Sequence, residues 1–374
     1  MAKTLFRRLT KKILIISNIV LAILFLLGCY AGYFNPATWW FLGLLTLSSF
    51  YLLILLLAFS IMWLFARSRW ALLSLVAILA AFGPMTNIIP IRISSPFTIQ
   101  KSTALRVMSW NVEHFDILEH KTHPERKQQM LDIINEYQPD IACFQEMVGG
   151  DKSPNAINYL PAMMQQLSFT DHFYTYNPKL DFDGDHHFGI IIFSRYPIIN
   201  RQMVSSYPND YNSIFQYIDI KKGNDTLRVF NIHLQSLRFS PTNLKYIDDP
   251  EFEDKEAISQ SKSIIGKFKV GFLKRKAQAE RVRQEMEKSP YPIIVCGDFN
   301  DVPNSYAYRT IGKGMKDVFV ERGRGFGRTF SGISPTLRID NIFVDKRFSV
   351  DQFTRIPKKL SDHFPIIADV NLGK

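Results

Sequence analysis

The sequence predicts an α/β domain preceded by three membrane-spanning helices. Two observations lead to this fold class. Residues 1–89 contain three long apolar stretches without a charged side chain, and residues 105–374 alternate apolar, strand-like runs with polar segments of helical period. A third observation concerns function, because several of these apolar runs end in side chains that bind metal or phosphate.

The predicted membrane anchor comprises residues 1–89. Its apolar stretches cover about 13–33, 39–66 and 70–89. Each reaches the roughly 20 residues needed to cross the core of a bilayer. Trp39, Trp40 and Trp70 stand at the stretch ends, where tryptophan is common in membrane proteins. A signal peptide would explain one such stretch but not three, so we expect an integral membrane protein with the lipid bilayer as its partner.

The basic residues around the stretches predict their orientation. The leader, residues 1–12, carries five Lys or Arg, the loop at 67–69 carries two, and the loop at 35–38 carries none. By the positive-inside rule the leader and the loop at 67–69 face the cytoplasm. We therefore expect residues 90–104 to be a juxtamembrane linker and residues 105–374 to lie outside the cytoplasm, as a periplasmic domain at a bacterial inner membrane.

The charge of the chain argues against a dedicated duplex-DNA binder. The formal net charge is +11, but residues 1–100 hold eight basic and no acidic residues. Residues 101–374 therefore combine 37 basic with 34 acidic residues. A balance of +3 over this length gives little electrostatic attraction to a polyanion.

The elements expected in residues 105–374 follow one another as in an α/β domain. A helix is predicted at 123–137, with Pro124 near its start and an apolar face. A mainly helical segment is predicted at 250–288. Strands are predicted within 105–112, 140–147, 188–198, 227–236, 291–301, 338–344 and 360–370.

Polar side chains of one chemical kind end most of these strands. Strand ends at one edge of a sheet meet in space, so we expect a single pocket. A turn, a helix cap or a satisfied core histidine would explain any one of these residues, but not six independent strand ends. The residues are Asn111, Glu146, His233, Asp298 with Asn300, Asp340, and Asp362 with His363.

The carboxylates of this set suit a magnesium ion. Glu146 and Asp362 supply hard oxygen ligands, and Mg²⁺ binds few protein groups and keeps several waters. No Cys/His cluster with zinc spacing is present in the sequence. We expect Mg²⁺, with Mn²⁺ as a substitute, to neutralise charge on a phosphoryl group.

The remaining residues suit hydrolysis of a phosphoester. Asp298 is placed to orient and deprotonate an attacking water, while Asn300 and Asn111 donate hydrogen bonds to phosphate oxygens. His363, held by Asp340, stabilises the negative charge of the pentacovalent state. We expect His233 to bind phosphate on the leaving-group side.

Six motifs in this order resemble the endonuclease/exonuclease/phosphatase superfamily: SWNV, FQE, NIHL, GDFND, RIDNIFV and SDHFPI. The resemblance spans about 105–371 and implies a four-layer αββα sandwich, with two packed β-sheets and a metal-dependent site at one edge. It also implies that Glu146, Asn111 and Asp362 lie at the metal. His233 is similar to a histidine of the deoxyribonuclease, sphingomyelinase and phosphatase branches.

The substrate stays open at this point. Relatives of this kind cleave nucleic acid, sphingomyelin and inositol phosphates with nearly the same residues. A non-catalytic binding protein on the same fold is the rival hypothesis, although every motif position is retained. No protein partner is indicated. The segment 247–288, acidic and then basic, is read either as an interfacial arm or as an ordinary surface helix packed on the domain.

Overall fold

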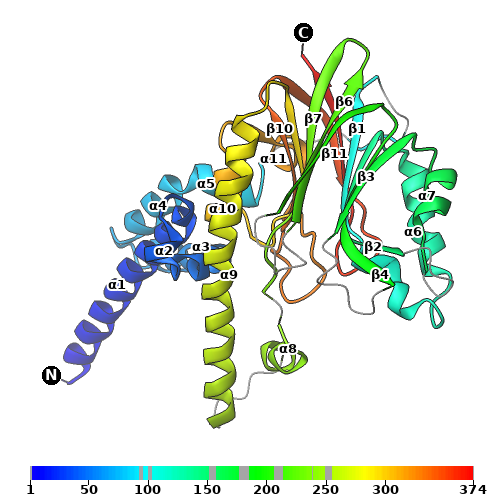
Figure 1. The fold of residues 1–374 in the computed structure, drawn as a ribbon. Coiled ribbons are helices and arrows are strands. Elements are labelled where there is room, and N and C mark those ends of the chain that lie inside the picture. Colours follow the sequence, from blue (N-terminus) through cyan, green and yellow to red (C-terminus); the bar gives the residue numbers. More distant parts are fainter. Residues whose placement is uncertain are drawn as a thin grey trace.

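The computed structural model describes the chain from Ala2 to Gly373 in eight stretches (Figure 1). The described residues are 2–91, 96–99, 103–150, 157–176, 185–205, 214–237, 239–248 and 255–373. They form a group of N-terminal helices beside a sandwich of two β-sheets.

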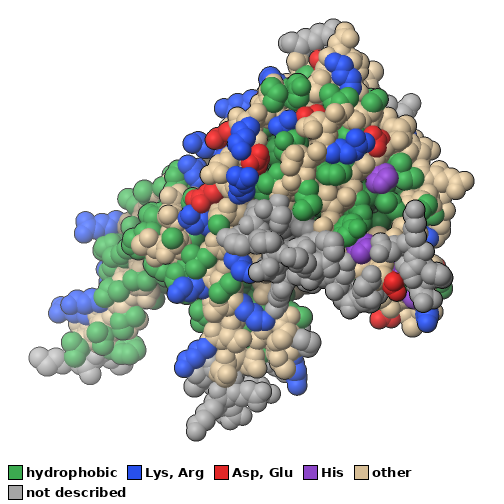
Figure 2. Space-filling model, in the orientation of Figure 1, with side chains coloured by type: hydrophobic (Ala, Val, Ile, Leu, Met, Phe, Trp, Pro, Cys, Tyr) green, Lys and Arg blue, Asp and Glu red, His purple; other side chains and the backbone are tan. Residues whose placement is uncertain are grey.

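Two N-terminal helices are long and apolar enough to cross a membrane. These are α1 (Ala2–Cys29) and α3 (Leu42–Phe65), joined by η1 (Ala31–Tyr33) and α2 (Pro36–Trp39). Asn35 caps α2, since its Oδ1 accepts a hydrogen bond from Ala37 N at 2.9 Å. Hydrophobic side chains gather on the surface of this part of the molecule (Figure 2). The expectation of membrane-spanning helices is thereby supported for the first two stretches.

The third stretch, predicted as a membrane-spanning helix at about 70–89, is bent. It forms α4 (Ala71–Ala80) and α5 (Phe82–Ile88), which meet at an angle of 63°. Pro84 explains the bend because it lacks the N–H that would reach the carbonyl of Ala80. The Tyr30 hydroxyl donates to this Ala80 oxygen instead, at 2.5 Å. The prediction of three membrane-spanning helices is therefore supported in part: two helices are long and apolar enough, and the bent pair makes a third only if both halves count as one span.

The first sheet, sheet A, contains six strands in the order β11-β12-β1-β2-β4-β3. Within it, β1 and β2 run parallel and the other neighbours run antiparallel. Its strands are β1 (Leu105–Asn111), β2 (Ile141–Gly150), β3 (Asp171–Tyr176), β4 (His186–Ser194), β11 (Phe348–Arg355) and β12 (Ile366–Leu372).

The second sheet, sheet B, has the order β5-β6-β7-β8-β10-β9. Here β7 and β8 form the parallel pair, so both sheets are mixed. Its strands are β5 (Ile198–Ser205), β6 (Ile214–Lys222), β7 (Asp225–His233), β8 (Ile293–Asp298), β9 (Met315–Asp317) and β10 (Asp340–Asp345).

Three hydrophobic clusters hold the layers together. Between the sheets, Val107 of β1 and Ile294 of β8 belong to one fully buried cluster. Alternate residues of the same strands face outward: Met108 packs under α6 (Arg126–Tyr137) and α7 (Leu160–Gln166) on sheet A. Val295 packs under α9 (Lys255–Glu287) and α10 (Tyr306–Gly312) on sheet B. Burial of both faces explains why these strands read as continuous apolar runs. The expected pair of sheets flanked by helices is confirmed.

Residues 249–254 of the segment 247–288 lie outside the described residues, and the described part has features of both alternatives. The last third of α9 is an ordinary packed helix, because Ala279, Val282 and Met286 belong to the core over sheet B. Its first half projects past the sheets together with α8 (Pro241–Asp248), as Figure 1 shows. In this half Ile265 and Val270 are 45% and 52% exposed.

The N-terminal helices are docked on the α/β domain rather than tethered loosely to it. Asn304, in the segment after β8, donates to Pro84 O and accepts from Asn87 Nδ2, each at 2.8 Å. Arg338, just before β10, donates to Asn87 O at 2.8 Å. The end of α5 therefore touches both segments that flank the polar ends of β8 and β10.

Gly32 provides a test of this docking. A Cβ on Gly32 would lie 2.6 Å from Asn304 O and 2.8 Å from Ser305 O, both backbone atoms. We expect Gly32→Ala in the full-length protein to lower the free energy of unfolding by about 1–3 kcal/mol through this overlap. Gly83→Ala is the matched control because its Cβ would meet no atom within 4 Å. Equal thermal unfolding of the two variants in detergent would contradict the docked arrangement.

Candidate active site

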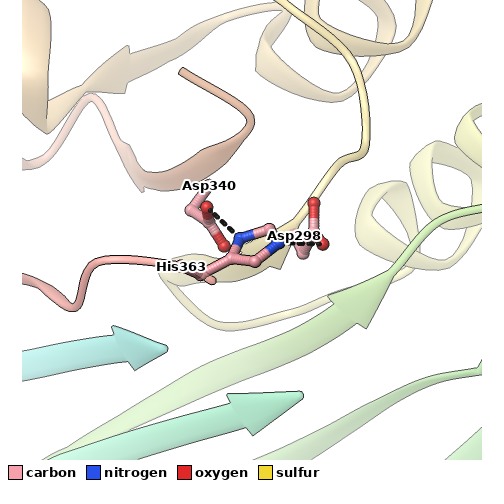
Figure 3. A group of neighbouring side chains, drawn as sticks. All are labelled: Asp298, Asp340 and His363. Carbon is pink, nitrogen blue, oxygen red and sulfur yellow. Dashed lines mark hydrogen bonds and ion pairs between the residues drawn. The ribbon is translucent and has the colours of Figure 1, made fainter. Parts of the chain in front are cut away.

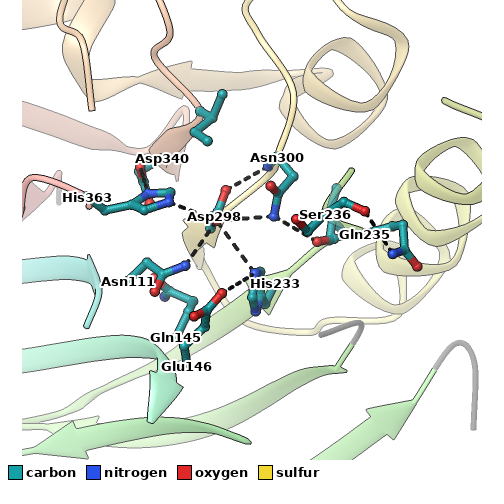
Figure 4. Close-up of polar contacts among 12 residues, drawn as sticks. Asn111, Gln145, Glu146, His233, Gln235, Ser236, Asp298, Asn300, Asp340 and His363 are labelled. Atoms are coloured by element: carbon teal, nitrogen blue, oxygen red, sulfur yellow. Dashed lines mark hydrogen bonds and ion pairs between the residues drawn. The ribbon is translucent and has the colours of Figure 1, made fainter. Parts of the chain in front are cut away.

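Five strands bring polar side chains to one edge of the sandwich (Figure 4). Parallel pairing places Asn111, the last residue of β1, beside Gln145 of β2, and His233, the last residue of β7, beside Asp298 of β8. Strand β10 starts where β8 ends, since Asp340 pairs with Asp298 in antiparallel register. The carboxyl ends of β1, β7 and β8 and the amino end of β10 therefore meet there, whereas Glu146, predicted to end its strand, lies within β2, which continues to Gly150.

Glu146 reaches this edge because β2 contains a bulge. The register between β2 and β4 shifts between Phe144 and Met147. Glu146 lies within this irregularity and has a φ of 53°, in the left-handed region. A bulge turns a side chain away from the regular alternation of a strand. Here the Glu146 carboxylate lies 3.7 Å from His233 Nε2 in the facing sheet.

A buried polar network lies beneath the site and joins the two sheets. Gln145 Nε2 of β2 donates to Asn231 Oδ1 of β7 at 2.7 Å. Asn231 Nδ2 donates in turn to Phe144 O and Ile191 O at 3.0 and 2.9 Å. Both side chains are fully buried. Because buried amides must be paired, this network fixes the register of one sheet on the other.

Asp298 is the centre of the hydrogen-bond arrangement at the strand ends. Its carboxylate accepts from Asn300 N at 2.7 Å, from Asn300 Nδ2 at 3.1 Å and from Asn111 Nδ2 at 3.3 Å. His233 Nε2 lies 3.5 Å away. Burial raises the pKa of Asp298 to about 8, although the His363 charge lowers it in part. A carboxylate held in this way is a suitable proton acceptor near neutral pH.

His363 and Asp340 form a closely bonded pair (Figure 3). His363 Nδ1 lies 2.8 Å from Asp340 Oδ2, and His363 Nε2 faces Asp298 Oδ2 at 3.8 Å. Burial opposes the imidazolium, but Asp340 and Asp298 raise the pKa of His363 well above its ordinary value. Thr329 holds Asp340 in position, since its Oγ1 accepts a hydrogen bond from Asp340 N at 3.0 Å.

The acidic side of the site fits a cation. Burial and then the charge of Asp362 raise the pKa of Glu146, which is the sign of carboxylates crowded without neutralisation. Asp340 Oδ1 is buried and has no hydrogen-bond partner among the described residues. The Asp362 side chain is 44% exposed and so accessible to a cation, and the metal position at Glu146 and Asp362 stays a prediction.

A second group of possible ligands consists of Asp298, Asp340 and His363, whose ligand atoms lie within 4.8 Å of one another. We favour the hydrogen-bonded reading of this group. The separation of 2.8 Å between Asp340 Oδ2 and His363 Nδ1 is that of an ordinary charge-assisted hydrogen bond and requires no ion.

Asn300 is placed differently from its expected role. Its backbone has a φ of 50°, and its Nδ2 donates to Leu234 O at 3.0 Å as well as to Asp298. Both amide hydrogens therefore serve to hold Asp298 and the end of β7. Asn111 contacts two carboxylates, since its side chain hydrogen-bonds Glu146 as well as Asp298.

Two residues of the site were not singled out from the sequence. His114 Nε2 lies 3.5 Å from Glu146 Oε2, and burial lowers the pKa of His114 to about 4. Glu113 accepts a hydrogen bond from Asp362 N at 2.8 Å and so holds the start of the His363 segment. Both follow Asn111 directly, and this closeness in sequence was the only available signal.

Comparison with known proteins identifies the family. The model of the Endonuclease/Exonuclease/phosphatase family matches residues 108–363. This range covers more than half of the chain and includes every predicted site residue. The chain belongs to the Endonuclease/Exonuclease/phosphatase family. The model of a domain of unknown function (DUF8431) matches residues 11–88, and no curated protein matches the sequence.

Solved structures share the fold of the family at low identity. An endonuclease/exonuclease/phosphatase from Bacteroides vulgatus has a TM-score of 0.51 at 18% identity, covering 72% of this chain and 100% of that one. A functionally unknown conserved protein from Enterococcus faecalis and a humanized TDP2 from D. rerio each have a TM-score of 0.50. They are 17% and 18% identical, with the same two shares covered. These likenesses support the family fold, whose members are phosphoesterases.

The charged pair predicts how stability depends on pH. A folded-state pKa of His363 above 6.5 contributes stability that is complete below pH 6.5 and is lost as pH rises through that higher value. The raised pKa of Asp298 acts in the same direction between pH 3.8 and about 8. We therefore expect the metal-free protein to unfold at lower temperature as pH increases from 6.5 to 9.

The corresponding experiment compares melting curves in EDTA across this pH range. His363→Gln should flatten the dependence, whereas His123→Gln, at a histidine with a 45% exposed side chain, should leave it unchanged. A wild-type melting temperature that rises with pH would show that the pair is not held as described.

Proposed function

We propose that this protein is a membrane-anchored, divalent-metal-dependent phosphoester hydrolase that uses in-line attack by water. The observation that supports this most directly is the arrangement around Asp298. One buried carboxylate is held by two amides and faces two histidines, beside a crowded group of acids. Such a set can deprotonate a water and stabilise negative charge on a phosphoryl group.

Each residue has a role in this proposal. Asp298 accepts the proton of the attacking water, and Asn300 keeps its carboxylate oriented. His363, protonated and held by Asp340, stabilises charge on the phosphoryl oxygens. Asn111, which lies between Asp298 and Glu146, donates to a phosphate oxygen when substrate is bound.

The acidic side carries the cation in the same proposal. Glu146 and Asp362 hold a divalent metal, with Asn111 beside it, and Mg²⁺ or Mn²⁺ supplies charge neutralisation there when bound. His233, between Glu146 and Asp298, binds phosphate on the leaving-group side.

The helices support an extracytoplasmic position of this site. Gly32, Pro84 and Asn87 contact the domain at the ends of the helices opposite to the basic leader, and Tyr51 contacts it from within α3. Arg67 and Arg69, between α3 and α4, lie at the end of the helices where the basic leader is, because Trp63 near the end of α3 lies beside Arg7 and Lys11. The positive-inside rule then places the domain outside the cytoplasm, at the inner membrane if the source is bacterial.

Two substrate classes are proposed, nucleic acid and lipid phosphoesters of the sphingomyelin or inositol type. The contact of α3 with the domain favours the lipid class. Tyr51 Oη lies 2.9 Å from Ser334 Oγ, and this segment pairs with the His363 segment through Phe330. A site beside a membrane helix gains access to headgroups without diffusion of the substrate through solution.

The test uses the full-length protein in lipid nanodiscs. Plasmid DNA, RNA, sphingomyelin vesicles and inositol phosphates are offered with Mg²⁺ or with EDTA. We expect Mg²⁺-dependent turnover of one class. Folded protein that binds Mg²⁺ but hydrolyses none of them would favour the non-catalytic binding protein on the same fold.

A further inference from the structure

A cleft rich in arginine lies beside the candidate active site and is not used by the chemistry proposed for it. Its volume is about 490 Å³. It is formed by the edge strand β11, the segment after α11 (Val318–Arg322) and residues 96–97 before β1. Its charged lining consists of Arg322, Arg324, Arg328 and Arg355, and its aromatic lining of Phe97, Phe319, Phe326 and Phe353. We call it the arginine cleft.

No acidic side chain lines the arginine cleft in the part of the chain that the structure describes. Among the described residues, none of its four arginines forms an ion pair with a carboxylate. Burial and then the nearby charge of Arg328 lower the pKa of Arg355, so these two cations face each other without an anion between them. Close like charges are costly, and an anion in the cleft would relieve the cost.

Arg355 has free hydrogen-bonding capacity. Its guanidinium lies 4.7 Å from the centre of the Phe364 ring, and it donates to no acceptor among the described residues although it is half-buried. Arg328, by contrast, donates to the carbonyls of Phe330 and Gly332. A guanidinium fork with unused donors in a recess is suited to a phosphate group.

The arginine cleft borders the membrane helix α3. Phe326 packs edge-on against Phe50 of α3 with ring centroids 4.6 Å apart. Pro335, in the lining, follows Ser334, which bonds Tyr51. We take one boundary of the hydrocarbon core to lie at Ala66, just before Arg67. A helix rises about 1.5 Å per residue, so a core about 30 Å thick then reaches its other boundary near Thr46. Phe50 and Tyr51 then lie about one helical turn inside it.

From this position we propose that the arginine cleft binds the phosphate group of an anionic membrane phospholipid. The unpaired arginines face a level where lipid phosphates are concentrated, and the phenylalanine rings provide an apolar wall for the part of the lipid below the headgroup. The site lies outside the arrangement around Asp298. It depends on membrane insertion of α3 but not on hydrolysis by this protein.

A bound lipid would also contact arginines that pack against the segments holding the active-site residues in place. Phe364, which stacks on Arg355, follows His363 and donates its backbone N–H to Thr329 O at 2.7 Å. Thr329 accepts from Asp340 N. An anion that fixes Arg355 and Arg328 therefore fixes both segments that carry the Asp340–His363 pair.

The experiment is native mass spectrometry of the full-length protein in detergent, with phosphatidylglycerol or phosphatidylcholine added. Arg355→Gln is the main variant because it removes a charge without breaking a hydrogen bond to a described residue. Arg347→Gln is the control, since Arg347 is an exposed arginine paired with Asp345. We expect selective retention of phosphatidylglycerol, an affinity at least tenfold lower in Arg355→Gln, and no change in Arg347→Gln.

Competition with inorganic phosphate distinguishes a lipid phosphate from free phosphate as the anion that the arginine cleft binds. Free phosphate at the concentration of the lipid should fail to displace phosphatidylglycerol, because it lacks the apolar part. Equal retention of both lipids, or unchanged retention in Arg355→Gln, would overturn the proposal. Displacement by free phosphate would overturn it as a lipid site and show a site for a soluble anion.

Discussion

Asp298→Asn is expected to lower kcat by about 10²–10⁴-fold, the usual contribution of a positioned general base. The substitution keeps the shape of the side chain but removes its ability to accept a proton from water. It also removes the negative charge opposite His363. The loss should appear in kcat, measured on whichever phosphoester the full-length protein hydrolyses.

Asp345→Asn is the matched control for this variant. Asp345 lies at the opposite end of β10 from Asp340 and pairs with Arg347 at the surface. The Asp345→Asn variant should retain wild-type activity. If Asp298→Asn kept more than about a tenth of kcat while remaining folded, another residue would have to act as the base, and the central role given to Asp298 would be wrong.

Glu146→Gln is expected to have opposite effects on the metal-free and the metal-loaded protein. Burial and the charge of Asp362 raise the pKa of this carboxyl, so its charged form destabilises the fold above pH 4.5 when no cation is bound. The variant should therefore be at least as stable as the wild type in EDTA. In Mg²⁺ the order should reverse, because the variant lacks a carboxylate ligand.

Thermal unfolding in EDTA and across a Mg²⁺ titration measures both effects. A ligand at about 100 times its Kd stabilises a protein by about 2.7 kcal/mol, and this gain should largely disappear in Glu146→Gln. Glu136→Gln serves as the control, since Glu136 lies on α6, has a side chain that is 42% exposed and pairs with Lys358. An unchanged Mg²⁺-dependent shift in Glu146→Gln would place the cation elsewhere, at Asp298, Asp340 and His363.

The docked anchor changes how such experiments should be designed. Asn304 and Arg338 hold the end of α5, and each stands within a few residues of Asp298 or Asp340. Removing the helices would leave these two side chains without partners they have in the full chain. Activity should therefore be measured on the full-length protein, with the Gly32→Ala variant as a subtler way to loosen the contact.

Much of the candidate site could be predicted from the sequence because it depends on local signals. Asp298, His233 and Asn111 each end an apolar run, and a strand carries its last side chain to the edge of the sheet whatever the order of strands. The first two apolar stretches were equally clear, since length and lack of charge are enough to indicate a helix that can span a bilayer. These features are properties of single segments.

Tertiary structure alone decided the features that join distant segments. The bulge that turns Glu146 toward His233 arises from the pairing of β2 with β4, which no local pattern marks. The bend at Pro84 is stabilised by Tyr30, some 50 residues away, and the arginine cleft gathers residues from three parts of the chain. The sequence by itself determined which residues are polar at strand ends and which helices are apolar. Where these groups meet depended on long-range packing, because contact energies between distant residues exist only once the chain is folded.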